Sequence, residues 1–417
     1  MEIAPISDGT PTDCGLPSLM TWLRRSRELS TKRPAAFPSP LQSGQKKYVW
    51  QYPSWPRLRW DAKPLFDLLA HARREQSLLL ARAREMGLSA QCGFFVDEAF
   101  TTAAIEGEKL DRASIRSSVA RRLGLDTAGL PEPQRHTDGL VEMLFDATLK
   151  FREPLTAKRL QGWQAALFPT GFSGMGQIAV GRWRSGTEPM RVVSGALGRE
   201  KVHFTAPPSK AVPGEMKAFL QWWRHPPRGL DGLIRAGMAH FWLVTIHPFE
   251  DGNGRVARAL TDMALAQDEG TGMRLYSLSA QILKERKQYY GTLESCQKSN
   301  GDITEWLALF LGMYARALVA SQVQVDRSLA ASRFWLAPRT HGLNERQRKV
   351  LQRMLDTGPE GLANCMTNRI YVSLTRVSRE SAKRDLAELE HLGILKRNPG
   401  AGRSVSYALR LDAADVT

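Results

Sequence analysis

The fold is decided by the stretch GLIRAGMAHFWLVTIHPFEDGNGRVAR, which runs from Gly232 to Arg258. In its first half, apolar residues recur near 3.6-residue spacing, and this pattern predicts a buried helix. Pro248 disfavours the helical region for the residue before it, so His247 is expected where that helix ends. The helical period resumes at Val256, after a Gly-Asn-Gly triplet. The sequence therefore predicts two helices joined by a short loop that carries a histidine.

The start of the second helix suits the phosphates of a nucleotide. Gly252, Asn253 and Gly254 open this helix, and its free N–H groups and positive dipole end attract phosphate. Arg255 and Arg258 lie three residues apart, on one helix face, where their guanidinium groups can each grip phosphate oxygens as a planar fork. These residues predict a binding site for a polyphosphate.

The remaining polar residues of the loop suit a transfer reaction. Asp251 supplies a hard oxygen for Mg²⁺, which binds through one or two carboxylates together with substrate phosphates. His247 is then left to take a proton from an attacking hydroxyl near neutral pH, whereas Phe249 is expected only to pack the loop onto the core. Each residue alone has a structural explanation, such as a turn or an Arg258–Asp262 ion pair. Eight specified positions in one window favour nucleotidyl transfer.

These residues fit the pattern H-x-F-x-[D/E]-G-N-G-R-x-x-R, and on this motif the chain resembles the Fic family. The resemblance covers roughly residues 47–325. It implies an all-α Fic fold with a small β-hairpin flap, and a protein adenylyltransferase that uses ATP and Mg²⁺ to modify a Ser, Thr or Tyr hydroxyl of a target protein or of itself. Some members move UMP, phosphocholine or phosphate instead, but the intact Gly254 and Arg255 favour AMP.

A second motif lies upstream, where Thr102, Glu106 and Gly107 fit the family's inhibitory pattern [S/T]-x-x-x-E-[G/N]. Apolar periodicity over 96–105 predicts a helix that ends at Gly107, so Glu106 lies in the last turn, where the dipole disfavours an anion without a nearby cation. The resemblance implies that this cation is Arg258 and that the pair keeps the γ-phosphate from its productive position. Thr102 is expected to hold the carboxylate. The alternative is that Glu106 is an ordinary solvated glutamate. If the motif is functional, Glu106 is also a candidate for AMP removal.

The flap is expected between Arg182 and Pro208, where short β-prone runs predict a hairpin. The resemblance implies that it clamps the target protein by strand addition near residues 191–205. Residues 182–184 are equally typical of a solvated face. The resemblance places three residues where relatives hold the adenine: Tyr289, Tyr290 and Gln297. Tyrosines at helical spacing are also typical of a hydrophobic core.

The length of 417 residues suggests two or three domains. The expected organisation is a mobile tail at 1–45, an N-terminal helical region with the inhibitory motif at 46–130, the Fic catalytic core at 131–330, a linker at 331–342 and a winged helix-turn-helix domain at 343–411. An aromatic cluster over 48–60 is expected to anchor the helical region, although such clusters also stack nucleobases.

The C-terminal region is expected to form three helices, at 343–355, 366–374 and 378–392, and a hairpin wing at 396–409. This order resembles a winged helix-turn-helix domain, whose third helix would present a basic face consisting of Arg376, Arg379, Lys383 and Arg384. Residues 343–410 hold 13 Lys or Arg against 7 Asp or Glu, which is only moderately basic. DNA binding and protein docking both remain open. A rival hypothesis is therefore a DNA-binding transcriptional regulator, with the Fic domain as nucleotide sensor or self-modifier.

The charge, cysteine content and apolar runs of the sequence indicate the partners and the cellular location. The net charge of +16 implies an acidic partner, such as nucleic acid, nucleotide or an acidic protein surface, although it also serves solubility. The four cysteines are scattered, which argues against a disulfide framework and a structural zinc site. No run approaches the 18 apolar residues of a membrane helix, and the N-terminus lacks a signal pattern. A cytoplasmic location without a membrane partner is expected, and a homodimer is left open.

Overall fold

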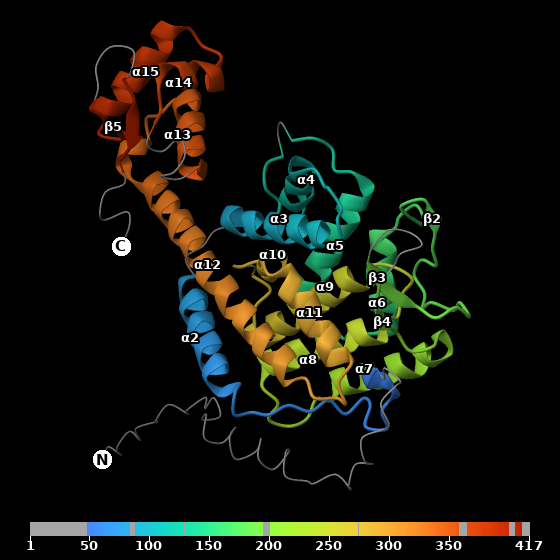
Figure 1. The fold of residues 1–417 in the computed structure, drawn as a ribbon. Helices are drawn as coiled ribbons and strands as arrows, with labels where there is room; N and C mark the ends of the chain where they lie inside the picture. Colours follow the sequence, from blue (N-terminus) through green and yellow to red (C-terminus); the bar gives the residue numbers. More distant parts are fainter. Residues whose placement is uncertain are drawn as a thin grey trace, which may run out of the picture.

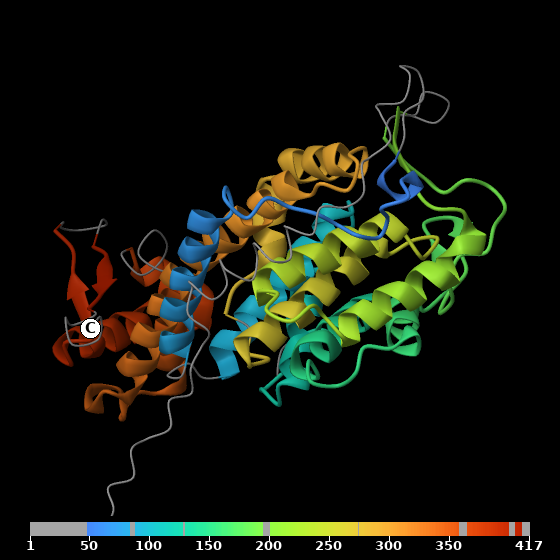
Figure 2. The same ribbon diagram turned by 90° about the horizontal axis from the view of Figure 1, so that it is seen from below.

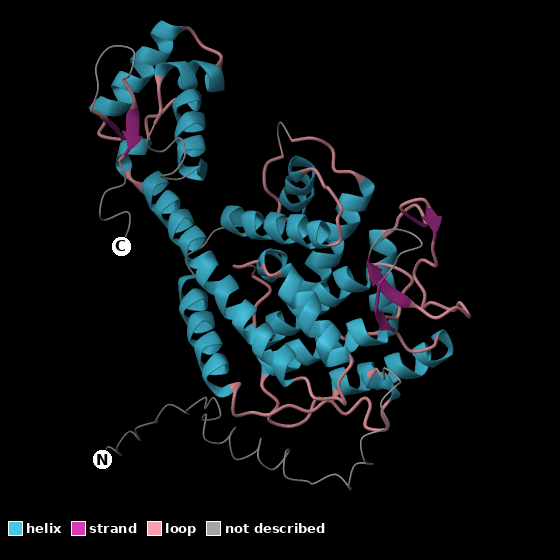
Figure 3. Cartoon of the chain, viewed as in Figure 1, coloured by secondary structure: helices cyan, strands magenta, loops and turns pink. Residues whose placement is uncertain are grey.

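The protein is mostly helical, and its strands form small two-stranded sheets (Figures 1 and 3). The computed structural model describes residues 48–83, 88–127, 130–194, 201–273, 275–357, 365–399 and 405–410. The expected tail at 1–45 lies outside the described residues. A main body, drawn from blue to yellow in Figure 1, is followed by a smaller C-terminal module, drawn in dark orange and red.

The main body is a set of packed helices whose apolar faces share one hydrophobic core. Its helices are α2 Phe66–Ala83, α3 Leu88–Ile105, α4 Arg112–Arg122, α5 Arg135–Leu149, α6 Ala157–Leu167, α7 Val212–Arg224, α8 Gly232–Ile246, α9 Asn253–Glu269, α10 Leu278–Lys284 and α11 Arg286–Gln297, with the 3-10 turns η1 Val49–Gln51 and η2 Ser209–Ala211.

Helices α8 and α9 form the centre of this body and pack against each other (Figure 1). Asp231 caps α8 by accepting the N–H groups of Leu233 and Ile234 at 2.8 and 3.4 Å. Every residue from Ala236 to Ile246 is buried. Both helices predicted from the opening stretch are confirmed, with the histidine and the glycine triplet between them.

Helix α3 runs beside α10 and α4 and also contacts α9. It ends at Ile105, and Gly107 then adopts a φ of +83°, a left-handed value that favours glycine. The helix end predicted at Gly107 is therefore confirmed. This placement brings the end of α3 to the start of α9.

Two short hairpins lie in the segment between α6 and α7. The strands β3 Arg191–Ser194 and β4 Lys201–Thr205 pair antiparallel, with an irregularity between Val192 and Val193, and this confirms the predicted hairpin. The strands β1 Phe172–Ser173 and β2 Gly176–Gln177 form a second pair that the sequence did not predict. Two residues per strand are too few to show an alternating pattern. In Figure 2, the β3–β4 hairpin lies at the end of the body away from the C-terminal module.

Helix α12, Thr304–Leu336, connects the main body with the C-terminal module (Figure 1). It packs along α2 and continues through 331–336, so the first half of the segment expected as a linker is helical; η3 Pro338–Thr340 follows. By length and composition α12 is the one described helix that could cross a membrane, contrary to the expected lack of such a run. Within the most apolar 18-residue stretch of α12, 67% is buried inside the protein. A core helix of a globular body has the same length and apolar composition.

The C-terminal module has a hydrophobic core of its own. Its elements are α13 Glu345–Thr357, α14 Asn368–Thr375, α15 Arg379–His391, β5 Leu395–Arg397 and β6 Tyr407–Leu409. The three helices and the antiparallel hairpin were all predicted. Phe334, near the end of α12, is fully buried in this core, so the end of α12 belongs to the module.

Candidate active site

His247 follows the last residue of α8 in a left-handed conformation, with φ 53° and ψ 60°. A non-glycine residue in this region costs on the order of 1–3 kcal/mol and persists only where its surroundings hold it. Its N–H donates to the carbonyl oxygen of Leu243 at 2.9 Å, and its own carbonyl accepts from Arg184 Nε at 2.7 Å. The histidine is thus fixed at the position between the two central helices that the sequence predicted.

The protonation state of His247 follows from its single ring contact. Nδ1 lies 3.3 Å from the carbonyl oxygen of Val244, which can only accept, so Nδ1 carries the proton and Nε2 carries the lone pair. Burial lowers the pKa of His247 to about 4, and Arg184 adds to this effect, although the Val244 carbonyl, Asp251 and Glu106 oppose it. The imidazole is therefore neutral at physiological pH and can accept a proton at Nε2.

Arg184 is a site residue that the sequence did not identify. Its side chain is buried, with 4% exposed, rather than part of the solvated face considered for 182–184. The guanidinium donates to the carbonyl oxygens of His247 at 2.7 Å and of Pro207 at 2.5 Å, and to Ser209 Oγ at 3.0 Å. Arg184 therefore ties the histidine loop to the segment that follows the β3–β4 hairpin. No local pattern marks this role, because its partners lie 23 to 63 residues away.

The start of α9 has the backbone geometry of an anion cradle. Gly252 has φ 89°, and the first N–H groups of the helix have no acceptor within it. Asn253 was expected to contact phosphate, but its side-chain Oδ1 accepts the N–H of Phe249 at 2.9 Å and its Nδ2 donates to the Phe249 carbonyl at 2.8 Å. This side chain is therefore used to close the loop, and only its backbone N–H remains for an anion. Phe249 is fully buried, as expected.

Arg258 is held by both residues of the upstream motif. Its Nη2 lies 2.6 Å from Glu106 Oε1, while its Nε donates to Thr102 Oγ1 at 2.6 Å. Thr102 thus binds the guanidinium and not the carboxylate, which corrects the role expected for it. Only 2% of the Arg258 side chain is exposed. Burial alone would lower the pKa of this guanidinium, but Glu106 raises it above its ordinary value, so the ion pair keeps Arg258 charged.

The Glu106 carboxylate also occupies the cradle itself. A Cβ atom placed on Gly254 would overlap Glu106 Oε1 and would lie 3.1 Å from Arg258 Nη1. The lack of a side chain at Gly254 therefore leaves the space that the carboxylate fills. An anion of the protein itself lies where the sequence predicted a phosphate site, beside a helix start and an arginine.

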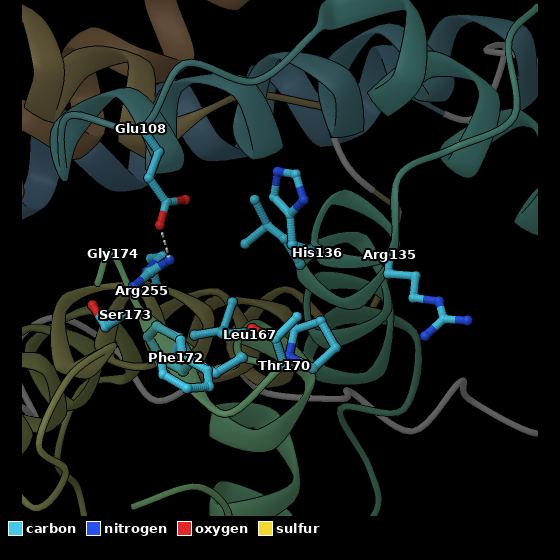
Figure 4. Close-up of a pocket in the computed structure, with 12 residues that line it drawn as sticks. Glu108, Arg135, His136, Leu167, Thr170, Phe172, Ser173, Gly174 and Arg255 are labelled. Carbon is cyan, nitrogen blue, oxygen red and sulfur yellow. Dashed lines mark hydrogen bonds and ion pairs between the residues drawn. The ribbon is translucent and has the colours of Figure 1, made fainter. Parts of the chain in front are cut away.

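Arg255 makes a second ion pair across the same junction. Its Nη1 lies 2.5 Å from Glu108 Oε1, and its guanidinium lies over the Phe168 ring with 4.9 Å to the centroid. Figure 4 shows Glu108 pointing down to Arg255, with His136 across the cavity. The cavity has a volume of about 290 Å³, and Ser173 also lines it. Glu108 was not predicted, because the upstream pattern ends at Gly107.

Asp251, the candidate metal ligand, is half-exposed beside Arg255. One of its oxygens contacts Ser173 Oγ in strand β1, and the other accepts the Gly252 N–H at 2.5 Å. The described residues contain no group of three or more His, Cys, Asp or Glu side chains arranged to hold a metal ion. Mg²⁺ commonly needs only one or two carboxylates when the substrate supplies phosphate oxygens, so a lone carboxylate at the cradle fits this ion.

The three residues expected around the adenine have different surroundings. Tyr289 is fully buried, and its hydroxyl lies 2.7 Å from Nε2 of the buried His240, so it packs in the core, which is the alternative that its helical spacing also allowed. Tyr290 is 40% exposed beside Arg286. Gln297 is buried and donates to Thr245 Oγ1 at 3.3 Å, on the last turn of α8. Tyr290 is the ring that a ligand can reach.

Comparison with known families agrees with this geometry. Residues 154–265 match the model of the Fic/DOC family, and residues 48–125 match the model of a domain of unknown function, DUF4172. The loop from His247 to Arg258 lies inside the segment that matches the Fic/DOC family model. Glu106 and Glu108 lie in the DUF4172 segment, so their ion pairs with Arg258 and Arg255 join the two matched regions.

Two similar curated proteins are named as a protein adenylyltransferase and a probable protein adenylyltransferase. The chain is 36% identical over 91 residues to a protein adenylyltransferase of Caenorhabditis elegans, which is 22% of this chain and 17% of that protein. It is 27% identical over 105 residues to a probable protein adenylyltransferase of Aquifex aeolicus, 25% of this chain and 30% of that protein. The chain thus spans less than a third of the length of either relative.

Solved structures give distant likenesses. A crystal structure of a Fic family protein from Desulfovibrio desulfuricans has a TM-score of 0.49 at 18% identity, covering 83% of this chain and 97% of that one. The Fic-1 structure from C. elegans has a TM-score of 0.43 at 19% identity, covering 64% of this chain and 72% of that one.

Proposed function

We propose that the protein is a protein adenylyltransferase that transfers AMP from ATP, with Mg²⁺, to a Ser, Thr or Tyr hydroxyl of a target protein or of itself, and that its own Glu106 inhibits it. The observation that carries the proposal is the Glu106 carboxylate at Gly254, bound to Arg258 at 2.6 Å. A site that binds its own anion through a helix start and an arginine is built for anions.

The chemistry follows from the positions of the protein's own groups. The backbone N–H groups at the start of α9 would hold the phosphate oxygens, and Arg255 and Arg258 would hold the β- and γ-phosphates once their carboxylate partners leave. His247 Nε2 would accept the proton of the target hydroxyl as its oxygen bonds to the α-phosphorus and pyrophosphate leaves. Asp251 would hold Mg²⁺, which neutralises phosphate charge when bound. Tyr290 and Gln297 would lie beside the adenine.

Glu106 would set the state of the enzyme. While its carboxylate occupies Gly254 and Arg258, a triphosphate meets a like charge where its γ-phosphate belongs. The Glu106 side chain is 29% exposed, so solvent reaches it and a competing anion can displace it. Since a carboxylate at this place is also suited to orient a water molecule, the same residue would assist AMP removal from a modified hydroxyl.

The test is transfer of label from α-labelled ATP in a cell lysate, followed by mass spectrometry of the labelled proteins. Glu106→Gly is expected to label itself or a lysate protein at least about tenfold more than the wild type, because freeing a charged partner is worth roughly 1.5–3 kcal/mol. The paired control is Glu106→Gly with His247→Ala, which should transfer nothing measurable to lysate proteins. Equal labelling by both would remove the assigned base, and absence of all label would remove the transferase proposal.

A second function is proposed for the C-terminal module, because Arg376, Arg379, Lys383 and Arg384 are all exposed at the end of α14 and along α15. A basic helix face of this kind supports an acidic partner, either DNA in a major groove or an acidic protein surface. In the first case the protein would act as a regulator of transcription that senses or modifies itself. We also propose a cytoplasmic location.

A further inference from the structure

A hydrogen-bonded chain of three side chains lies on the β3–β4 hairpin, apart from the cradle and from His247. Ser194 Oγ lies 2.6 Å from His203 Nε2, and His203 Nδ1 lies 2.6 Å from Glu294 Oε2. Ser194 and His203 belong to the hairpin, whereas Glu294 belongs to α11, 91 residues further along the chain. The order of atoms, hydroxyl to imidazole to carboxylate, is that of a serine nucleophile with its base.

The direction of the two hydrogen bonds is fixed by the carboxylate. Burial opposes ionisation of Glu294, but Lys298 and His203 outweigh it and hold the pKa of this carboxyl below its ordinary value. An ionised carboxylate only accepts, so His203 Nδ1 donates to it, and this leaves Nε2 to accept the Ser194 hydroxyl proton. The second carboxylate oxygen contacts Lys298 Nζ, which fixes the carboxylate at its place.

The hairpin register explains how Ser194 meets His203. Ser194 is paired with Lys201, and His203 is the unpaired extra residue of β4 at the irregularity between Val192 and Val193. The hydrogen bond between the two side chains therefore forms beside this bulge. Ser194 is exposed, while the side chain of His203 is only 26% exposed. The hydroxyl is therefore accessible to a reagent, and its base is partly protected.

We propose that Ser194 is a nucleophilic serine, activated by His203 and Glu294, that accepts a phosphorus electrophile and is the residue adenylylated when the protein modifies itself. The second clause rests on the proposed function, since ATP is the donor which that function supplies. The segment that follows the hairpin is tied to the candidate active site by Arg184, which binds the carbonyls of both Pro207 and His247.

The step balances without any further reactant. Ser194 Oγ forms a bond to the α-phosphorus of ATP while the bond from that phosphorus to the β-phosphate bridging oxygen breaks. Pyrophosphate leaves with the electron pair, and the serine proton moves to His203 Nε2, which takes the place of His247 as the base for this one residue, and then to solvent. The resulting imidazolium is stabilised by Glu294.

The first test uses a fluorophosphonate probe, which needs no ATP and none of the cradle. The full-length protein is labelled, and mass spectrometry gives the rate at Ser194, where fluoride is the leaving group. Loss of a general base costs about 10²–10⁴ in rate, so His203→Ala should label at least tenfold more slowly and Glu294→Gln at an intermediate rate. Ser77→Ala is the matched control, because Ser77 is an exposed serine whose hydroxyl donates to the Arg73 carbonyl. If Ser194 in the wild type is labelled no faster than Ser194 in His203→Ala, the proposal is overturned.

The second test uses α-labelled ATP with Glu106→Gly and with Glu106→Gly plus Ser194→Ala. Loss of most of the self-label in the double variant, with Ser194 identified as the labelled residue, supports the proposal. Equal self-label at other residues in both proteins refutes Ser194 as the acceptor and leaves the transferase intact. No label on any protein counts against the proposed function instead, and the fluorophosphonate rates then decide alone whether Ser194 is activated.

Discussion

Glu106, just past the end of α3, binds Arg258 on α9 across 152 residues of chain, with 2.6 Å between Oε1 and Nη2. Two residues later Glu108 binds Arg255 in the same way, at 2.5 Å. Both arginine side chains are almost fully buried, with 2% and 4% exposed. One short segment therefore neutralises both guanidinium groups that we assign to the phosphates.

We predict that Glu106 and Glu108 oppose ATP binding together. Glu106→Gly leaves Arg255 paired, so Glu108→Gln combined with Glu106→Gly should bind ATP several-fold more tightly than Glu106→Gly alone. Isothermal titration of ATP against the wild type, each single variant and the double variant measures this. The side chain of Glu108 is 38% exposed, so the contribution of its pair is expected to be smaller than that of Glu106. A double variant that binds no better than Glu106→Gly would remove Glu108 from the inhibitory contact.

We predict that His247 acts as a base down to acid pH. Its pKa is lowered to about 4 from the ordinary 6.5, because burial disfavours the charged ring. The neutral, active form therefore persists as pH falls from 7 to 5, where an exposed histidine would already be protonated. The measurement is kcat/KM for transfer by Glu106→Gly between pH 5 and 8, with His247→Ala as the inactive baseline. A decline centred near pH 6.5 would contradict the assigned environment.

We predict that Arg184→Met slows transfer and destabilises the protein. The change leaves the carbonyls of Pro207 and His247 without this donor. Each buried acceptor that loses its partner lowers the free energy of unfolding by about 1–3 kcal/mol. It also frees the strained His247 backbone, so kcat should fall more than the affinity for ATP. Thermal unfolding and transfer rates are compared with Arg182→Met, an exposed arginine two residues earlier. Similar results for the two variants would show that Arg184 does not position the loop.

The sequence predicted the elements whose pattern is local and repeated. Helices α8 and α9 extend over several turns with apolar spacing, and the glycines and Pro248 between them mark the loop. The pair formed by Glu106 and Arg258 was reached through family resemblance, since nothing local connects residues so far apart.

Other site residues were not predicted from the sequence, for physical reasons. Arg184 and Glu108 have ordinary charged side chains in sequence, and only the tertiary fold brings them to their partners. Ser173 lies in a strand too short for periodicity. The resemblance placed both Tyr289 and Tyr290 at the adenine, but adjacent residues on a helix point about 100° apart, so α11 buries one and exposes the other.

The last prediction concerns the C-terminal module, where the boundary of a truncation matters. A chain that ends near Pro338 would retain Phe334, which is fully buried in the module's core, and would expose it. A chain that ends at residue 332 avoids this and keeps every residue assigned to the candidate active site, so it should retain self-modification after Glu106→Gly.

If the module binds DNA, this truncated chain should lose affinity for promoter DNA, measured by fluorescence anisotropy at two salt concentrations. Arg379→Ala or Lys383→Ala in the full chain should each lower the salt slope by about one unit, because each would remove one phosphate contact. Glu380→Ala, on the same turn of α15, is the matched control. If full-length protein shows no DNA binding at low salt while the truncated chain modifies lysate targets poorly, the basic face of α15 docks a protein instead.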